Sequence, residues 1–396
     1  MRVAILGIGG LGRTLAMELR ADPRVSSLLL VDKHEERARI LASIAGRMPI
    51  EARGLDVENE DALVRAIRGC DLVVNAVLPR YNLAIMRACL GARAHYIDVA
   101  AAGPSVPGGK LGILEQLDLD SAFKAVGRTA LLSMGMDPGI SNVMAKDASS
   151  HLDHVDSIRI RAGNVVNLPG LRSFPLYSRE AFLEDILVRP TVWVDGRLEV
   201  REPLSEEEDF AFPAPVGTLR TFLVSHEEVK TLPRFLGKPV GRVDYKYALD
   251  PSLLQALVAL HRLGLLAEDR LTPIAGRMVP FRQVLLAALP EPSSLHTPLE
   301  GCEALCVEAE GTREGARLVR RGDLVLAHRE ASRRRSTTAA NYLTAAGTAI
   351  GVLLLAEGSV PGPGVVTAES LDPARVLQEW HARNLPMAWS ERPAAS

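Results

Sequence analysis

Aromatic side chains and cysteines are both scarce in this chain. Phenylalanine, tryptophan and tyrosine make up 4% of its 396 residues, and cysteine occurs only at positions 70, 89, 302 and 306. The cysteines form no C-x-x-C pair and match no other zinc-binding spacing, so we expect no metal site. Free thiols of this kind suit a reducing compartment, and we expect the protein to be cytoplasmic.

The chain also lacks an excess of either charge and any long hydrophobic run. Its 46 basic and 48 acidic residues nearly balance, so no overall field attracts nucleic acid or an anionic membrane. The longest apolar segment, residues 344–356, is too short to span a membrane and is interpreted as a buried helix. We therefore expect a small molecule, and neither nucleic acid nor a membrane, as the partner.

A glycine-rich turn directly follows an apolar strand at the start of the chain. Gly7, Gly9 and Gly12 have the G-x-G-x-x-G spacing of a dinucleotide-binding turn. Gly7 permits the tight turn, Gly9 leaves no Cβ between the backbone and a pyrophosphate, and Gly12 lets the next helix pack closely. We expect Gly10 and Leu11, which lie inside this turn, to bind the cofactor as well.

An aspartate stands where a carboxylate would accept the ribose hydroxyls of the cofactor. Asp32 ends the second apolar run and lies twenty residues after Gly12. Its carboxylate would repel a 2′-phosphate, so the sequence favours NAD over NADP. The cationic neighbours Lys33 and His34 would offset part of that repulsion.

The first third of the chain alternates short apolar strands with helical patterns. Such alternation predicts an α/β fold with a doubly wound, parallel Rossmann sheet. The expected strands are residues 28–31, 50–55, 71–77, 95–99 and 129–133, and a single helix is expected over residues 113–126.

From about residue 157 the strands alternate apolar and polar residues, which is typical of a sheet with one solvated face. Residues 191–200 predict a hairpin about an Asp-Gly turn. We predict that residues 1–145 form the dinucleotide-binding domain and residues 146–337 an inserted α+β domain for substrate binding and dimerisation. Residues 338–396 are predicted to form a helical segment that returns to the first domain.

In an open parallel sheet, ligands bind outside the carboxyl ends of the strands. The candidate cofactor contacts after the third and fourth strands are Asp56, Val57, Asn75, Ala76, Val77 and Pro79. Asp98 follows the fifth strand and is expected near the nicotinamide and the substrate. Two alternatives stay open: Asp56 either contacts adenine or caps the next helix, and Asn75 either contacts ribose or bonds its own turn.

After the sixth strand, Pro138 and Gly139 force a turn next to Asp137. The Asp137 carboxylate either faces the cleft between the domains or caps the helix expected over residues 140–148. Residues 135–140, Gly-Met-Asp-Pro-Gly-Ile, resemble the signature of the saccharopine dehydrogenase family. Further segments with a similar resemblance, in the order of that family, are residues 71–79, 244–247, 347–350 and 364–366.

The resemblance implies NAD(P)-dependent chemistry at a carbon–nitrogen bond, as in saccharopine reductase, lysine 6-dehydrogenase and carboxynorspermidine dehydrogenase. It also implies a homodimer and a substrate-binding role for Asp137. Where saccharopine reductases use an arginine, the best alignment places Glu227, within Ser-His-Glu-Glu at residues 225–228. That replacement disfavours a carboxylate-rich substrate and favours a basic amino acid or a polyamine-like amine.

In such a reaction a hydride passes between an amine-bearing carbon and nicotinamide while a protein group handles the amine proton. The candidates for that role are Asp137 and His226, followed by Lys246. Arg179 is a candidate clamp for a substrate carboxylate, and Glu227 a candidate contact for an amine. Each of these residues also has an alternative without a catalytic or binding role. His226 is then a solvated or core histidine, Lys246 a surface lysine, and Arg179 part of an ion pair on a helix surface.

Four functions therefore remain open. The leading one is an amine-oxidising dehydrogenase that resembles lysine 6-dehydrogenase. The alternatives are an imine reductase of the carboxynorspermidine or saccharopine type, and a regulator that binds the dinucleotide without turnover. A reductase of another carbonyl or enoyl bond would use the same cofactor domain.

Overall fold

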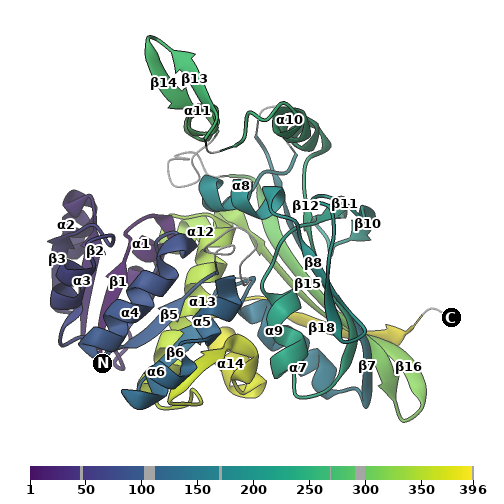
Figure 1. Cartoon of the computed structure of the whole chain (residues 1–396). Helices are drawn as coiled ribbons and strands as arrows, with labels where there is room; N and C mark the ends of the chain where they lie inside the picture. The colour runs from purple at the N-terminus through teal and green to yellow at the C-terminus, as the bar shows by residue number, and fades with distance from the viewer. Residues whose placement is uncertain (45–47, 102–111, 169–171, 268, 290–298, 395–396) are drawn as a thin grey trace.

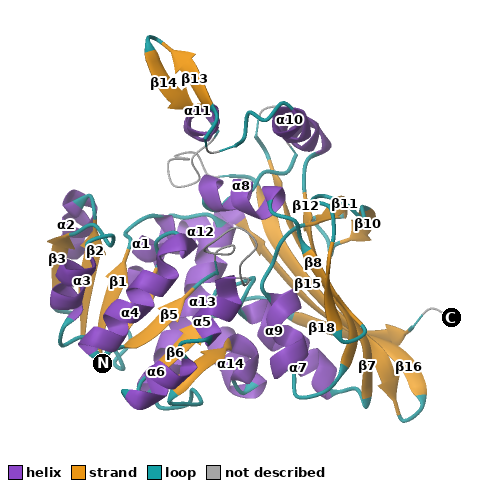
Figure 2. Cartoon of the chain, viewed as in Figure 1, coloured by secondary structure: helices purple, strands orange, loops and turns teal. Residues whose placement is uncertain are grey.

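The fold contains two sheets, seen side by side in a computed structural model of the whole chain (Figure 1). The structure describes residues 1–44, 48–101, 112–168, 172–267, 269–289 and 299–394. Helices cover the smaller sheet, and the larger sheet curves away from it with its long strands side by side (Figure 2). The site described below lies between them.

The first sheet is parallel throughout and has the strand order β17-β6-β5-β4-β1-β2-β3. Its strands are β1 (Arg2–Leu6), β2 (Ser27–Asp32), β3 (Ile50–Gly54), β4 (Leu72–Asn75), β5 (His95–Asp98), β6 (Thr129–Leu132) and β17 (Gly364–Thr367). The central strands are short runs of fully buried apolar residues, as a sheet covered on both faces requires. The predicted doubly wound Rossmann fold is confirmed.

The helices that connect these strands are α1 (Gly10–Leu19), α2 (Glu35–Ile44), α3 (Glu60–Ile67), η1 (Pro79–Tyr81), α4 (Asn82–Ala92), α5 (Gly112–Leu117) and α6 (Asp120–Ala125). The single helix expected over residues 113–126 is wrong, because the chain turns between α5 and α6. There the Leu119 N–H donates to the Gln116 carbonyl, a tighter turn than the α-helix makes.

The second sheet is mixed and follows the order β10-β11-β12-β7-β15-β16-β18, with the β8–β9 hairpin attached to β12. Its strands are β7 (His154–Val166), β8 (Thr191–Val194), β9 (Arg197–Val200), β10 (Glu208–Ala211), β11 (Thr218–Leu223), β12 (Val240–Ala248), β15 (Gly301–Arg313), β16 (Ala316–Ala327) and β18 (Ala388–Pro393). The predicted hairpin is present, and Asp195 and Gly196 both have positive φ, as a two-residue turn of this kind requires.

The helices of this part are α7 (Ile140–Ser150), α8 (Arg179–Leu187), α9 (Glu228–Phe235), α10 (Pro251–Arg262), α11 (Phe281–Ala288) and α12 (His328–Arg335). A separate hairpin, β13 (Leu271–Ile274) with β14 (Arg277–Pro280), projects beyond the body of the molecule at the top of Figure 1. The predicted inserted α+β domain therefore has a sheet, its covering helices and one projecting arm.

The chain then returns to the first sheet through α13 (Ala339–Ala356), which packs against α1, and through β17, η3 (Ala368–Ser370) and α14 (Pro373–Ala382). Helix α13 is long and apolar enough to cross a membrane, but 83% of it is buried inside the fold, as expected for a core helix. The last strand departs from the sequence prediction, because β18 pairs with β16 of the second sheet. There the Arg320 guanidinium lies over the Trp389 ring.

Candidate active site

A cleft of about 1290 Å³ opens between the carboxyl edge of the first sheet and the second sheet. One wall comes from the turns after β1 to β4. The other comes from the turn after β6, from helix α8, from the start of α9 and from β12. Its lining includes Gly7, Gly9, Gly10, Leu11, Asp32, Asp56, Val57, Ala76, Val77, Pro79, Asp137, Tyr177, Arg179, Asp185, His226, Glu227, Lys230, Tyr245, Tyr247 and Glu303.

The glycine turn leaves a space that side chains would fill. Gly7 has φ +92°, and a Cβ on Gly12 would lie 1.9 Å from the Gly7 carbonyl oxygen, so strand and helix approach as closely as backbones can. A Cβ on Gly9 would meet nothing within 4 Å, and Gly9 begins α1 without a side-chain cap. The helix start therefore faces the cleft with room for an anion, which fits the pyrophosphate of a dinucleotide.

Asp32 lines the same wall and holds the glycine turn in place. One carboxylate oxygen accepts a hydrogen bond from the Ile8 N–H at 2.7 Å, and the other accepts from the His34 N–H at 2.8 Å. Each oxygen keeps a further lone pair for a ribose hydroxyl. Lys33 and Arg37 also line this end of the cleft.

Asp56 lies in the cleft wall and does not cap the following helix. Its Oδ1 accepts from the Glu58 N–H at 3.1 Å, whereas the cap of α3 is Asn59, which accepts from the Ala62 N–H. Val57 lies beside it in the wall. The helix-cap alternative for Asp56 is therefore wrong, and adenine contact stays a prediction.

Asn75 and Asp98 do not line the cleft. The Asn75 amide donates to Asn82 and to the Tyr96 hydroxyl, and its oxygen accepts from the Val77 N–H, which is the turn-bonding alternative. Asp98 is buried and accepts hydrogen bonds from the Ser133 N–H and from the side chains of Tyr96 and Gln116. Burial raises the pKa of Asp98 to about 7. Both residues therefore brace the strand ends below the cleft.

Asp137 faces the cleft and is not the cap of α7. The Gly139 N–H, at the helix start, is instead bonded to the Asn142 side chain at 2.9 Å. The Tyr245 hydroxyl donates to Asp137 Oδ2 at 2.5 Å, and burial raises the pKa of this carboxyl to about 7. Its turn is locked against α13, because a Cβ on Gly347 would lie 2.2 Å from the Gly135 carbonyl oxygen.

His226 is held as a cation at the centre of the cleft. Its Nδ1 lies 2.5 Å from Glu228 Oε2, and its ring stacks on Tyr245 with centroids 3.6 Å apart. Burial lowers the pKa of His226, but the Glu228 carboxylate outweighs it and raises the value to about 10. Glu228 is itself fixed by the Ser141 hydroxyl at 2.6 Å. Because His226 lines the cleft, the alternative of a core histidine is wrong.

Two further carboxyl groups line the substrate end of the cleft and were not predicted from the sequence. Asp185 accepts from the Tyr177 hydroxyl at 3.0 Å, and burial raises its pKa to about 7. Among the described residues, Glu303 accepts one long contact of 3.4 Å, from the Asn164 amide, and burial raises its pKa well above the usual value. Nothing in the sequence near either residue distinguishes it from a surface carboxylate.

Two of the three remaining predicted substrate contacts line the cleft, and the third lies on the far face of the second sheet. Glu227 lines the cleft and accepts from the Ala101 N–H, and Arg179 lines it while donating to the Leu286 and Leu289 carbonyls. Lys246 points away from the cleft, because alternate residues of β12 face opposite sides, and its ammonium pairs with Glu208 at 2.8 Å.

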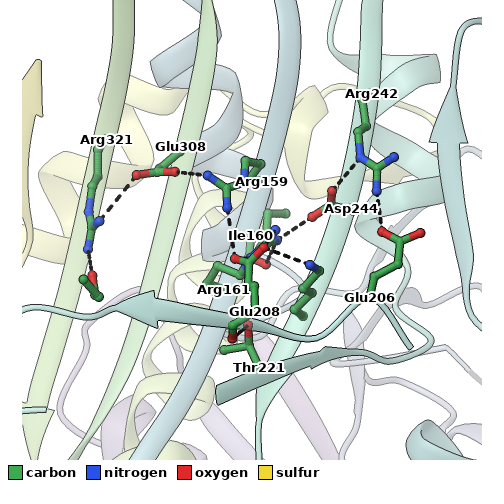
Figure 3. A network of polar contacts seen from close by, with 12 residues as sticks. Arg159, Ile160, Arg161, Glu206, Glu208, Thr221, Arg242, Asp244, Glu308 and Arg321 are labelled. Atoms are coloured by element: carbon green, nitrogen blue, oxygen red, sulfur yellow. Dashed lines mark hydrogen bonds and ion pairs between the residues drawn. The ribbon is translucent and has the colours of Figure 1, made fainter. Parts of the chain in front are cut away.

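Glu208 belongs to an ionic network on that far face, in which Arg159, Arg161, Arg242 and Asp244 also take part (Figure 3). On the cleft side, His226, Glu227 and Glu228 offer ligand atoms within 4.8 Å of one another. Because His226 and Glu228 are already joined by a hydrogen bond, this group has the geometry of an ion pair.

Both parts of the chain match a known family. Residues 3–131 match the saccharopine dehydrogenase NADP binding domain, and residues 135–385 match the saccharopine dehydrogenase C-terminal domain. The chain is 26% identical to the carboxyaminopropylagmatine dehydrogenase of Synechocystis sp., over 98% of this chain and 97% of that protein. It is 28% identical to the carboxynorspermidine synthase of Vibrio cholerae, over 96% of this chain and 94% of that protein.

Two solved structures share the fold. The saccharopine dehydrogenase (L-Glu forming) of Saccharomyces cerevisiae superposes with a TM-score of 0.75 at 14% identity, over 99% of each chain. The homospermidine synthase of Legionella pneumophila, solved with NAD, superposes with a TM-score of 0.71 at 16% identity, over 98% of this chain and 91% of that one.

Proposed function

Because the chain belongs to the saccharopine dehydrogenase family, we propose that it reduces an imine to a carboxylated polyamine, which is the substrate of the reverse oxidation. The protein is an NAD(P)-dependent oxidoreductase that acts on a carbon–nitrogen bond of an amine or amino acid. Two of its relatives are named for polyamines that bear a carboxyl group. That favours a polyamine over lysine as the substrate.

The observation that carries the proposal is the gathering of one buried and two half-buried carboxyl groups, together with tyrosines, at the substrate end of the cleft. Asp137, Asp185 and Glu303 all have pKa values raised by burial, so each gains from a neighbouring cation. An elongated polycation supplies several such cations at once. Saccharopine carries fewer amines and more carboxylates, and would meet repulsion here.

The protein groups needed for imine reduction surround His226. The bound nicotinamide supplies or accepts the hydride. Because Glu228 engages Nδ1 of His226, Nε2 is left to donate a proton to the imine nitrogen. A histidine with a pKa of about 10 is protonated at neutral pH, which suits the reductive direction. Asp137 then pairs with the ammonium form of the amine.

The test is an assay of nicotinamide reduction with candidate amines at alkaline pH, where the oxidation is favoured. We expect turnover with carboxynorspermidine or carboxyaminopropylagmatine, and much less with lysine, saccharopine or norspermidine. Turnover with lysine or saccharopine alone would contradict the proposal. Consumption of reduced cofactor by enones, or cofactor binding without turnover of any amine, would favour the alternative functions.

Binding of a polyamine is expected to release protons from the holoenzyme. At about pH 6.5 Asp137 and Asp185 are partly protonated, and an adjacent ammonium lowers the pKa of each, so roughly one proton leaves on binding. Affinity should therefore rise as the pH increases from 6 to 8. Titration calorimetry in buffers of different ionisation enthalpy measures the release.

Asp137→Asn is the matched variant for this measurement, because it keeps the shape of the side chain and cannot titrate. It should release fewer protons than the wild type. Heats that do not depend on the buffer, in wild type and variant alike, would show that these carboxyls do not meet the substrate cations.

We also propose that NAD is preferred over NADP, because the Asp32 carboxylate lines the cleft after the second strand and would repel a 2′-phosphate there. We expect KM to be about tenfold or more lower for NADH than for NADPH, and Asp32→Ser to narrow that ratio, since the repulsion of one charge is of this order. Initial rates with both cofactors measure it. A wild-type preference for NADPH would show that Lys33 and Arg37 dominate this end of the cleft.

A cytoplasmic homodimer completes the proposal. The four cysteines are all buried free thiols, which suits a reducing compartment. Leu271 and Met278 on the projecting hairpin are at least half exposed, and such apolar surface is typical of a contact with another subunit. Light scattering of the purified protein measures the mass, and a monomer at micromolar concentration would contradict the dimer.

A further inference from the structure

Lys230, in the first turn of α9, is a buried cation that lines the cleft. Lys230 is 7% exposed, and it lies among the residues that line the substrate end of the cleft. In the part of the chain that the structure describes, no hydrogen bond or ion pair joins its ammonium to another group. Its Nζ is not fully enclosed, so the ammonium opens onto the cleft, where an anionic ligand would supply the missing acceptor.

Away from the cofactor end, where Arg13, Lys33 and Arg37 lie, the other cations of the cleft are already engaged. His226 is paired with Glu228 at 2.5 Å, and Arg80 is paired with Glu180 at 2.6 Å. The Arg179 guanidinium donates to the carbonyls of Leu286 and Leu289, which fixes it against the loop after α11. Arg179, the clamp predicted from the sequence, is therefore held by the backbone, and Lys230 remains for an anion.

Three acidic residues near Lys230 influence the charge of its ammonium group. Burial is the main influence and lowers the pKa of Lys230, while Glu227, Glu228 and Asp185 oppose that shift from a distance. These carboxylates favour the charged form of the ammonium without contacting it. An incoming carboxylate would bind the ammonium directly and stabilise its protonated form.

We propose that the Lys230 ammonium binds the carboxylate of the substrate and thereby selects carboxylated amines over their uncarboxylated counterparts. This inference rests on the proposed function. Lys230 lies four positions after His226, which precedes α9, and both residues line the cleft, so a carboxylate held by Lys230 lies on the same wall as the proton donor. The amines of the substrate then extend toward Asp137, Asp185 and Glu303.

The experiment compares wild type with Lys230→Met and Lys230→Arg, each as the full-length holoenzyme. KM is measured for carboxynorspermidine and for norspermidine, which differ only in the carboxyl group. Losing one charge-assisted contact should raise KM for the carboxylated amine about 10- to 100-fold and leave KM for norspermidine within about twofold. Lys230→Arg should retain much of the preference, because it keeps the charge.

Two controls separate this result from misfolding and from failure of the proposed function. Lys124→Met removes a cation from the exposed face of α6 and should change neither constant. Thermal melting should show Lys230→Met to be at least as stable as wild type, because a charge without a partner is removed from a mostly buried side chain. If the wild type turns over neither amine, the proposed function fails, and calorimetric binding of the two amines to wild type and Lys230→Met still decides the role of Lys230. Equal loss for both amines, or no loss for either, would overturn the inference.

Discussion

Replacement of His226 by asparagine is expected to lower kcat for imine reduction by about 10²- to 10⁴-fold, the usual contribution of a general acid. Asparagine keeps a hydrogen-bonding group near Glu228 but cannot give up a proton at neutral pH. KM should change little, since the carboxyl groups that meet the substrate amines remain. Steady-state rates of reduced-cofactor oxidation measure the effect, and His154→Asn, at an exposed histidine, is the control.

The pH profile distinguishes proton donation by His226 from a purely structural role of its side chain. The active form holds a protonated His226, so the rate should be constant near neutrality and be lost as the pH rises through the folded pKa of about 10. Glu228→Gln removes the charge that raises this pKa, so the alkaline limb should move to lower pH. If Glu228→Gln lowers the rate but leaves the alkaline limb of the pH profile at the same pH, Glu228 only supports the structure.

Replacement of Gly12 by alanine is expected to weaken dinucleotide binding at least about 100-fold and to lower the stability of the protein by about 1–3 kcal/mol, the usual cost of overpacking. The new Cβ would lie 1.9 Å from the Gly7 carbonyl oxygen, so strand and helix must separate. Because Gly7 already has φ +92°, its backbone has little freedom to move away from the new Cβ. Titration calorimetry with NAD and thermal melting measure the two effects.

Gly9→Ala is the matched control, because a Cβ there meets nothing within 4 Å in the protein itself. This variant should melt like wild type and still lose affinity, since its methyl group occupies the space of the pyrophosphate. Normal NAD affinity in Gly12→Ala would mean that close approach of α1 is not needed for binding. Equal loss of stability in both variants would show that the turn itself fails to fold.

Much of the first domain is predictable because its information is local. A buried strand such as β1 is one short apolar run, and the turn after it needs glycine at position 12 because of its close approach to Gly7, five positions earlier. The split between α5 and α6 was missed because the whole stretch has a helical pattern. It depends on a single tight turn at Leu119.

The site was only partly predictable because its chemistry depends on pairs that are far apart in the sequence. Asp137 was found from its turn, but its partner Tyr245 is 108 residues away. Glu228 meets Ser141 across 87 residues, and Asn164 meets Glu303 across 139. The burial that shifts the pKa values of these groups arises only when the two sheets come together, and no local pattern records it.

The pairing of β17 with β6 has a consequence for how the protein is made. Six strands of the parallel sheet leave the ribosome early, while the seventh is synthesised only after the whole inserted domain. Until then β6 presents an unpaired edge, which is a template for association with other chains. The newly made chain therefore passes through an aggregation-prone stage that lasts for most of translation, and its yield in a cell should depend on chaperones that shield this edge.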